Sequence, residues 1–103
     1  MKVFISGRIS GDDRYREKFG EAEAKLAEMG HSVMNPARLE AYPGFGWEDY
    51  MHVCRAMQER CDAVLMLGDW QESRGAKIEH DRAISLMQSL YYSMDDVREA
   101  CTE

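Results

Sequence analysis

The chain has 103 residues, of which 45% are hydrophobic and 31% are charged, and its formal net charge is −6. This length and mixture are typical of one globular domain, which we expect to span residues 1–103. The acidic balance argues against nucleic acid as a partner, because binding to a phosphate backbone needs a basic face. A small anionic ligand is still compatible with it, since backbone N–H groups at a helix start bind phosphate without net positive charge.

The chain also lacks the patterns of membrane and secreted proteins. No apolar run approaches the ~20 residues of a membrane-spanning helix, so no membrane partner is expected. The N-terminal residues enter a predicted strand directly, without the apolar region and cleavage site of a signal peptide, which indicates a cytoplasmic protein. Cys54 and Cys61 lie on one face of a predicted helix and are expected to be small buried hydrophobes. The histidines show no metal-ligand spacing with them, so we expect no metal and no other cofactor.

The first half of the chain predicts two strands and one helix. Residues 2–6 are a short apolar run that ends in Ser6-Gly7, which predicts a strand followed by a loop. A helix is predicted from about residue 13 to 29, because apolar residues recur every three or four positions and Gly30 stands where a C-cap glycine belongs. Residues 31–34 predict a second strand, and 37–46, rich in proline and glycine, predict a loop.

The second half continues the alternation. A helix is predicted over 47–60, and the uninterrupted apolar run 63–67 is typical of a strand buried on both faces of a parallel sheet. A third helix is predicted over 74–87, a last strand over 89–92, and a short helix over 94–100 with Ser93 as its N-cap. This order predicts an α/β, Rossmann- or flavodoxin-like three-layer fold with a parallel sheet of four to five strands in the order 2-1-3-4.

That strand order places the loops after the first and third strands side by side, where ligands bind in open α/β sheets. The first loop offers Ser6, Gly7, Arg8 and Gly11: the glycines permit close backbone approach, the serine offers a hydroxyl, and the arginine can pair with an anion. The same residues also fit a plain glycine-rich turn, and they form neither a dinucleotide fingerprint nor a P-loop.

The second loop contains Asp69, Trp70, Ser73 and Gly75. Ser73 fits a helix N-cap, and a hydroxyl at that place also suits a phosphate or hydroxyl ligand. Trp70 fits either stacking on a base or sugar, or a partly buried aromatic. We treat all four as candidate substrate-binding residues.

Glu79 lies about one turn into the helix that follows the second loop. A carboxylate there is often solvated or pairs with the helix dipole. Its helix face, shared with Ala76 and Ala83, is expected to meet the sheet edge, and Asp69 and Ser73 are nearby. The sequence therefore points to Glu79 as the centre of the chemistry.

The pattern resembles a family of short uncharacterised proteins, common in phage and bacterial genomes, that is placed near the nucleoside 2-deoxyribosyltransferases. The resemblance rests on Val3-Phe4-Ile5-Ser6-Gly7, Gly30-His31, Asn35-Pro36, Cys61-Asp62-Ala63-Val64, Trp70, Ser73, Gly75-Ala76 and Glu79. It implies a protein that binds a nucleoside or deoxynucleoside 5′-monophosphate and cleaves or transfers at the N-glycosidic bond. Glu79 would be the nucleophile, Ser73 would hold the 5′-phosphate, and residues 6–11 would touch sugar and phosphate. It also implies a homodimer or higher oligomer, with which the apolar segments 86–87 and 90–92 are compatible.

Two positions depart from the pattern of the wider superfamily. Cys54 stands where the superfamily has an aspartate that acts as an acid, and Phe4 stands where it has a tyrosine that orients the nucleophile. Asp49 is a candidate replacement acid, although it is off register. These departures favour an alternative function, a non-catalytic module on the same fold that binds a nucleotide or an ADP-ribose-like ligand as a sensor or sink. A structural protein with a vestigial crevice is a third reading.

Overall fold

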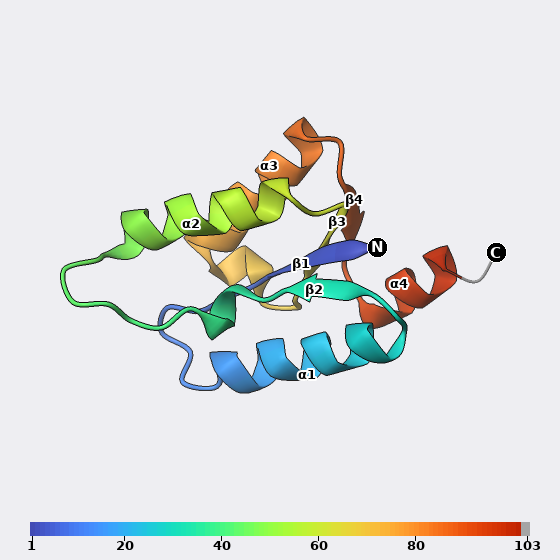
Figure 1. The fold of residues 1–103 in the computed structure, drawn as a ribbon, viewed down its shortest axis with the longest axis horizontal. Helices are drawn as coiled ribbons and strands as arrows, with labels where there is room; N and C mark the ends of the chain where they lie inside the picture. The colour runs from blue at the N-terminus through green and yellow to red at the C-terminus, as the bar shows by residue number, and fades with distance from the viewer. Residues whose placement is uncertain (102–103) are drawn as a thin grey trace.

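The computed structural model describes residues 1–101 and contains one parallel sheet (Figure 1). Its strands are β1 (Lys2–Ser6), β2 (Ser32–Met34), β3 (Ala63–Met66) and β4 (Ser89–Tyr91). They lie in the order β2-β1-β3-β4, and every neighbouring pair is parallel. The predicted fold class and strand order are therefore confirmed.

Helices cover both faces of this sheet. The α-helices are α1 (Tyr15–Glu28), α2 (Trp47–Glu59), α3 (Arg74–Ser85) and α4 (Met94–Ala100), and short 3₁₀ turns are η1 (Pro36–Arg38) and η2 (Trp70–Glu72). In Figure 1, α1 and α4 lie below the sheet and α2 and α3 above it. Alternate strand residues supply the two cores: Val3 and Ile5 pack with α1 and α4, whereas Phe4 and Val64 pack with α2 and α3. This division follows from the opposite directions of successive side chains in a strand.

The helix ends differ from the predictions by one or two residues. Gly30 has a φ of 85°, as expected of a C-cap glycine, and the His31 N–H donates to the Leu26 carbonyl across the turn. The third helix was predicted to reach residue 87 but ends at Ser85, because Met87 adopts a φ of 55° and the Gln88 N–H turns back to the Ala83 carbonyl. Within residues 1–101, the helices are all too short or too polar to cross a bilayer.

The strand order brings the loops after β1 and β3 together. The Leu67 N–H donates to the Ser6 carbonyl at 2.8 Å, which extends the β1–β3 pairing just beyond the strands. Two residues farther on, the Arg8 N–H donates to Asp69 Oδ1 at 3.1 Å. The predicted juxtaposition of the two loops is therefore present at the carboxyl edge of the sheet.

Candidate functional site

A cavity of about 350 Å³ opens at this edge of the sheet. Three parts of the chain enclose it: the loop after β1 with the start of α1, the segment from η1 into α2, and the start of α3. Its lining comprises Gly7, Ile9, Ser10, Tyr15, Arg16, Phe19, Pro36, Leu39, Glu40, Ala41, Phe45, Gly46, Trp47, Tyr50, Met51, Cys54, Ser73, Gly75, Ala76 and Glu79.

Glu79 brings a buried carboxyl group to the wall of this cavity. The residue is 5% exposed, and its Oε1 accepts a 2.6 Å hydrogen bond from the hydroxyl of Ser6, which is fully buried at the end of β1. Burial raises the pKa of Glu79 from 4.5 to about 7, although the Ser6 hydrogen bond and the positive charge of Arg82 act in the opposite direction. Near neutral pH, the carboxyl group is therefore divided between its protonated and ionised forms.

Cys54 faces Glu79 from α2. It is buried and lines the same cavity. Burial, followed by the negative charge of Glu79, raises the pKa of its thiol to about 12. The thiol is consequently neutral at physiological pH and supplies an uncharged wall beside the carboxyl group.

Gln58, which the sequence did not single out, fixes α3 against α2 at the level of Glu79. It is fully buried, and its Nε2 donates to the Glu79 carbonyl oxygen at 2.8 Å. Its Oε1 accepts a hydrogen bond from Arg82 at 3.2 Å, and Gln88 donates to its backbone carbonyl at 2.8 Å. A buried amide satisfied on both ends holds the helix in one position, since an unpaired polar group there would be costly.

The first predicted loop contributes to the site unequally. Ser6 contacts Glu79, and Gly7 lines the cavity. A Cβ atom on Gly7 would lie 2.9 Å from Leu67 Cβ, so the close approach of the two loops requires glycine. Arg8 and Gly11 lie outside the lining formed by residues 1–101: the Arg8 Nε donates to the Ser10 carbonyl, and Gly11 turns the loop with a φ of 80°.

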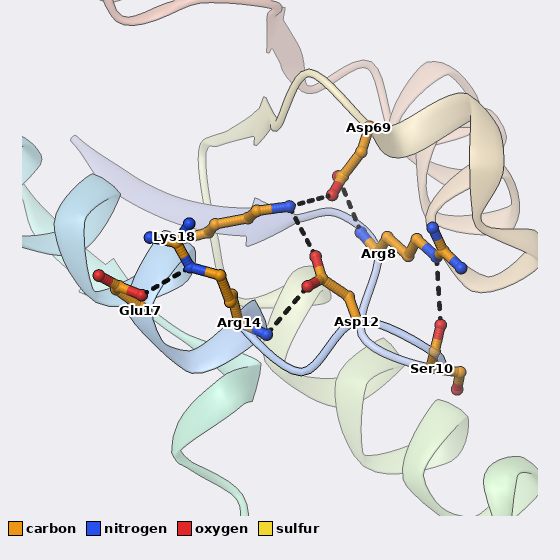
Figure 2. A network of polar contacts seen from close by, with 7 residues as sticks. All are labelled: Arg8, Ser10, Asp12, Arg14, Glu17, Lys18 and Asp69. Carbon is orange, nitrogen blue, oxygen red and sulfur yellow. Dashed lines mark hydrogen bonds and ion pairs between the residues drawn. The ribbon is translucent and has the colours of Figure 1, made fainter.

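Of the four residues predicted in the second loop, two line the cavity and two make contacts elsewhere. Ser73 and Gly75 line the cavity, and the Ser73 hydroxyl caps α3 by accepting a 3.1 Å hydrogen bond from the Ala76 N–H. Trp70 instead stacks on His80 with ring centroids 4.3 Å apart, and it packs partly buried against the core beneath α3. Both carboxylate oxygens of Asp69 are engaged (Figure 2): one accepts from the Arg8 N–H of the first loop, and the other accepts from the Lys18 ammonium of α1.

Asp49, the candidate replacement acid, lies at the start of α2. Its Oδ2 accepts a 2.8 Å hydrogen bond from the Gly46 N–H, so the carboxylate caps the helix. It does not contribute to the cavity lining formed by residues 1–101. The structure thus brings together Glu79, Ser6, Gly7, Ser73 and Gly75 but leaves Asp49 at the helix end.

Residues 37–46, predicted only as a loop, lead into an aromatic wall of the cavity that the sequence pattern did not predict. Phe45, Trp47 and Tyr50 line the cavity from this segment and the first turns of α2. The Tyr50 hydroxyl accepts a 2.7 Å hydrogen bond from the Tyr42 N–H and so ties the loop to the helix. The concentration of aromatic residues between positions 42 and 50 was the signal that pointed to this wall.

The site shows no sign of a metal centre in the described part of the chain, where no group of three histidine, cysteine or acidic side chains is placed to hold an ion. The polar and aromatic groups that line the cavity include the buried carboxyl group of Glu79, the Arg16 guanidinium, hydroxyl groups and aromatic rings. These groups suit the hydrogen bonding and stacking of a small polar ring compound.

Comparison with known proteins places this geometry in a family. Residues 1–92 match the model of a family described as Domain of unknown function (DUF4406). No curated protein sequence matches the chain. The solved structure of a 2-deoxyribosyltransferase from the psychrotolerant bacterium Bacillus psychrosaccharolyticus is similar with a TM-score of 0.70 and 17% sequence identity, over 87% of this chain and 69% of that chain. The predicted relationship is thus confirmed at the level of the fold: the chain belongs to the DUF4406 family and has a 2-deoxyribosyltransferase-like fold.

Proposed function

We propose that this protein binds a nucleoside or its 5′-monophosphate in the cavity and cleaves or transfers at the N-glycosidic bond, with Glu79 as the nucleophile. The observation that carries the proposal is the placement of Glu79, which is buried on the cavity wall and held by the Ser6 hydroxyl. A carboxyl group kept in one orientation beside an enclosed space is what covalent glycosyl transfer requires. The shared fold with a 2-deoxyribosyltransferase is consistent with this assignment.

The size and lining of the cavity support a ligand of this class. Its volume of about 350 Å³ is at the lower end of the range for small-molecule sites, which favours a single nucleoside over a dinucleotide. Phe45, Trp47 and Tyr50 offer aromatic faces on which a base can stack. Ser73 and Gly75 lie at the start of α3, where a hydroxyl and the positive end of the helix dipole suit a 5′-phosphate.

In the proposed reaction, an ionised Glu79 oxygen attacks the anomeric carbon of the sugar. The bond from that carbon to the base nitrogen breaks, and the base leaves with the bonding electron pair and takes up a proton. Water then hydrolyses the glycosyl ester, or a second base nitrogen displaces Glu79 and completes a transfer. Only the ionised carboxyl group is nucleophilic, so the rate is expected to rise with pH through the pKa of about 7.

The surroundings of Glu79 also favour the second candidate function, a binding module without turnover. Cys54, a thiol of pKa about 12, stands where the wider superfamily that the sequence resembles has an aspartate, and Asp49 is engaged in capping α2. A site without a proton donor for the departing base loses about 10²- to 10⁴-fold in rate. In such a module, Glu79 would hydrogen-bond the sugar hydroxyls of a nucleotide or an ADP-ribose-like ligand.

We further propose that the protein is a cytoplasmic homodimer. Leu86, Met87 and Tyr92 leave large apolar side chains exposed at the end of α3 and just after β4. Burial of apolar surface drives association, so a second copy that covers this region would be stabilised. Light scattering on the purified chain tests the oligomeric state directly.

The functional test compares wild type with Glu79→Gln and with Glu28→Gln, a matched change at an exposed glutamate at the end of α1. Each protein is incubated with nucleosides, their 5′-monophosphates and ADP-ribose; thermal shifts report binding and chromatography measures free base. Base release by wild type and Glu28→Gln, but not by a ligand-binding Glu79→Gln, supports the nucleophile. Binding without base release supports the module, and the absence of any ligand-induced shift contradicts both functions.

A further inference from the structure

Asp69 ties the loop after β1 to the loop after β3 (Figure 2). It is not among the described residues that line the cavity. Its Oδ1 accepts a 3.1 Å hydrogen bond from the Arg8 N–H, and its Oδ2 lies 3.4 Å from Lys18 Nζ. Lys18 in turn lies 2.6 Å from Asp12 Oδ2, and the other oxygen of Asp12 accepts a 2.9 Å hydrogen bond from the Arg14 N–H. Two carboxylates and one ammonium group thus join the two loops to the first turn of α1.

The contact with Arg8 is the structurally important part of this network. The side chain of Asp69 is 16% exposed, and its hydrogen bond to a backbone N–H is charge-assisted. The Lys18 side chain is about half exposed, and ion pairs of that kind contribute little. The absence of a Cβ atom on Gly7 allows this approach, because such an atom would lie 3.2 Å from Asp69 Oδ1.

Two contacts hold the backbone just after the Cα atom of Ser6, the residue that holds Glu79. The Ser6 carbonyl accepts the Leu67 N–H at 2.8 Å, and two residues later the Arg8 N–H donates to Asp69. The backbone that leaves Ser6 is therefore attached to the β3 side at two points. The Ser6 hydroxyl, 2.6 Å from Glu79 Oε1, depends on the direction of that backbone.

We propose that Asp69 is a positioning residue for Glu79, acting through the Arg8 N–H and the backbone of Ser6 rather than through contact with a ligand. The inference rests on the proposed function, in which Glu79 is the working group of the cavity. In this role, the Asp69 carboxylate keeps the backbone of Ser6 in place. The Ser6 hydroxyl can hold Glu79 in one orientation only if that backbone does not move.

The direction in which the pKa of Glu79 changes when Asp69 is replaced separates this positioning role from a direct effect of the Asp69 charge. Besides burial, Ser6 from β1 and Arg82 from α3 act on the pKa of the Glu79 carboxyl group, and Cys54 faces it from α2 as a neutral thiol. None of these three residues is changed in the test. Removal of the negative charge of Asp69 by itself lowers the pKa of a neighbouring carboxyl group. Loss of the Ser6 hydrogen bond raises that pKa, since the bond favours the ionised form.

The experiment measures the pKa of Glu79 by carbon NMR of its carboxyl group, with Glu79→Gln identifying the signal. The variants are Asp69→Ala, Asp69→Asn, Lys18→Met and, as a matched control, Glu72→Ala at an exposed carboxylate three residues away. We expect Asp69→Ala to raise the pKa by about 1, the equivalent of one lost hydrogen bond to a charged group. Asp69→Asn should stay close to wild type, because its amide oxygen can still accept the Arg8 N–H, and so should Lys18→Met and the control.

A folded Asp69→Ala whose Glu79 pKa is unchanged or lower would overturn the inference. The inference would also fail if Asp69→Asn and Lys18→Met shifted the Glu79 pKa as far as Asp69→Ala does. If Asp69→Ala does not fold, Asp69→Ser, whose hydroxyl is too short to keep the same bond, is judged by the same criteria. Because the readout needs no turnover, its failure is distinct from failure of the proposed function. A wild type that releases no base leaves the pKa result intact.

Discussion

Replacement of Glu79 by glutamine should stabilise the protein, and by an amount that grows with pH. Below about pH 4.5, the carboxyl group is protonated in both the folded and unfolded chains, so it contributes no pH dependence. As the pH rises, the unfolded chain ionises first, because burial raises the folded pKa to about 7, and the folded state loses stability until both forms are ionised. The pKa of Glu79 is 4.5 in the unfolded chain and about 7 in the folded one, and each pKa unit is worth about 1.4 kcal/mol. The free energy of unfolding of wild type therefore falls by about 3 kcal/mol between these pH values. This is a large share of the ~5–15 kcal/mol that stabilises a typical domain.

Urea denaturation followed by circular dichroism, at several pH values between about 4.5 and 8.5, measures this effect. The quantity of interest is the free energy of unfolding of Glu79→Gln minus that of wild type, because other titrating groups cancel in the difference. We expect the difference to rise by about 3 kcal/mol across the range and to level off above pH 7. Glu28→Gln, at an exposed position, should give a flat difference. A flat profile for Glu79→Gln as well would refute the burial argument.

Three further outcomes follow from the contacts around the cavity. Ser6→Ala should destabilise the protein by about 1–3 kcal/mol above pH 7, where the ionised carboxylate loses its donor, and by less below pH 5; denaturation at the two pH values checks this. Gly7→Ala should lower the free energy of unfolding by about 1–3 kcal/mol, because its Cβ would lie 2.9 Å from Leu67 Cβ; an unchanged melting temperature would contradict that clash. In native protein at pH 8, iodoacetamide should label exposed Cys101 rapidly and leave Cys54, with a pKa of about 12, unlabelled until the chain unfolds; peptide mass spectrometry reads both sites.

The site could be predicted only in part from the sequence. Glu79 was singled out by its place after a strand-end loop, and Ser73 by its place at a helix start; both line the cavity. The role of Ser6 in holding Glu79 depends on two residues 73 positions apart, and no local pattern encodes that contact. Trp70 was expected either to stack on a base or sugar or to be a partly buried aromatic. Its ring is partly buried and stacked on His80, and that stacking depends on how η2 lies against α3.

The sequence by itself determined the secondary structure and the strand order. Alternating apolar runs encode strands and helices locally, and right-handed crossovers leave few ways to order parallel strands. Only the tertiary structure decided which side chains meet at the carboxyl edge of the sheet. The aromatic wall of Phe45, Trp47 and Tyr50 arises where distant segments pack, as do the contacts of the buried Gln58 amide and the Asp69 contact with Arg8. Side-chain contacts of this kind depend on burial and close packing in three dimensions, whereas hydrophobic periodicity records only the face that each element buries.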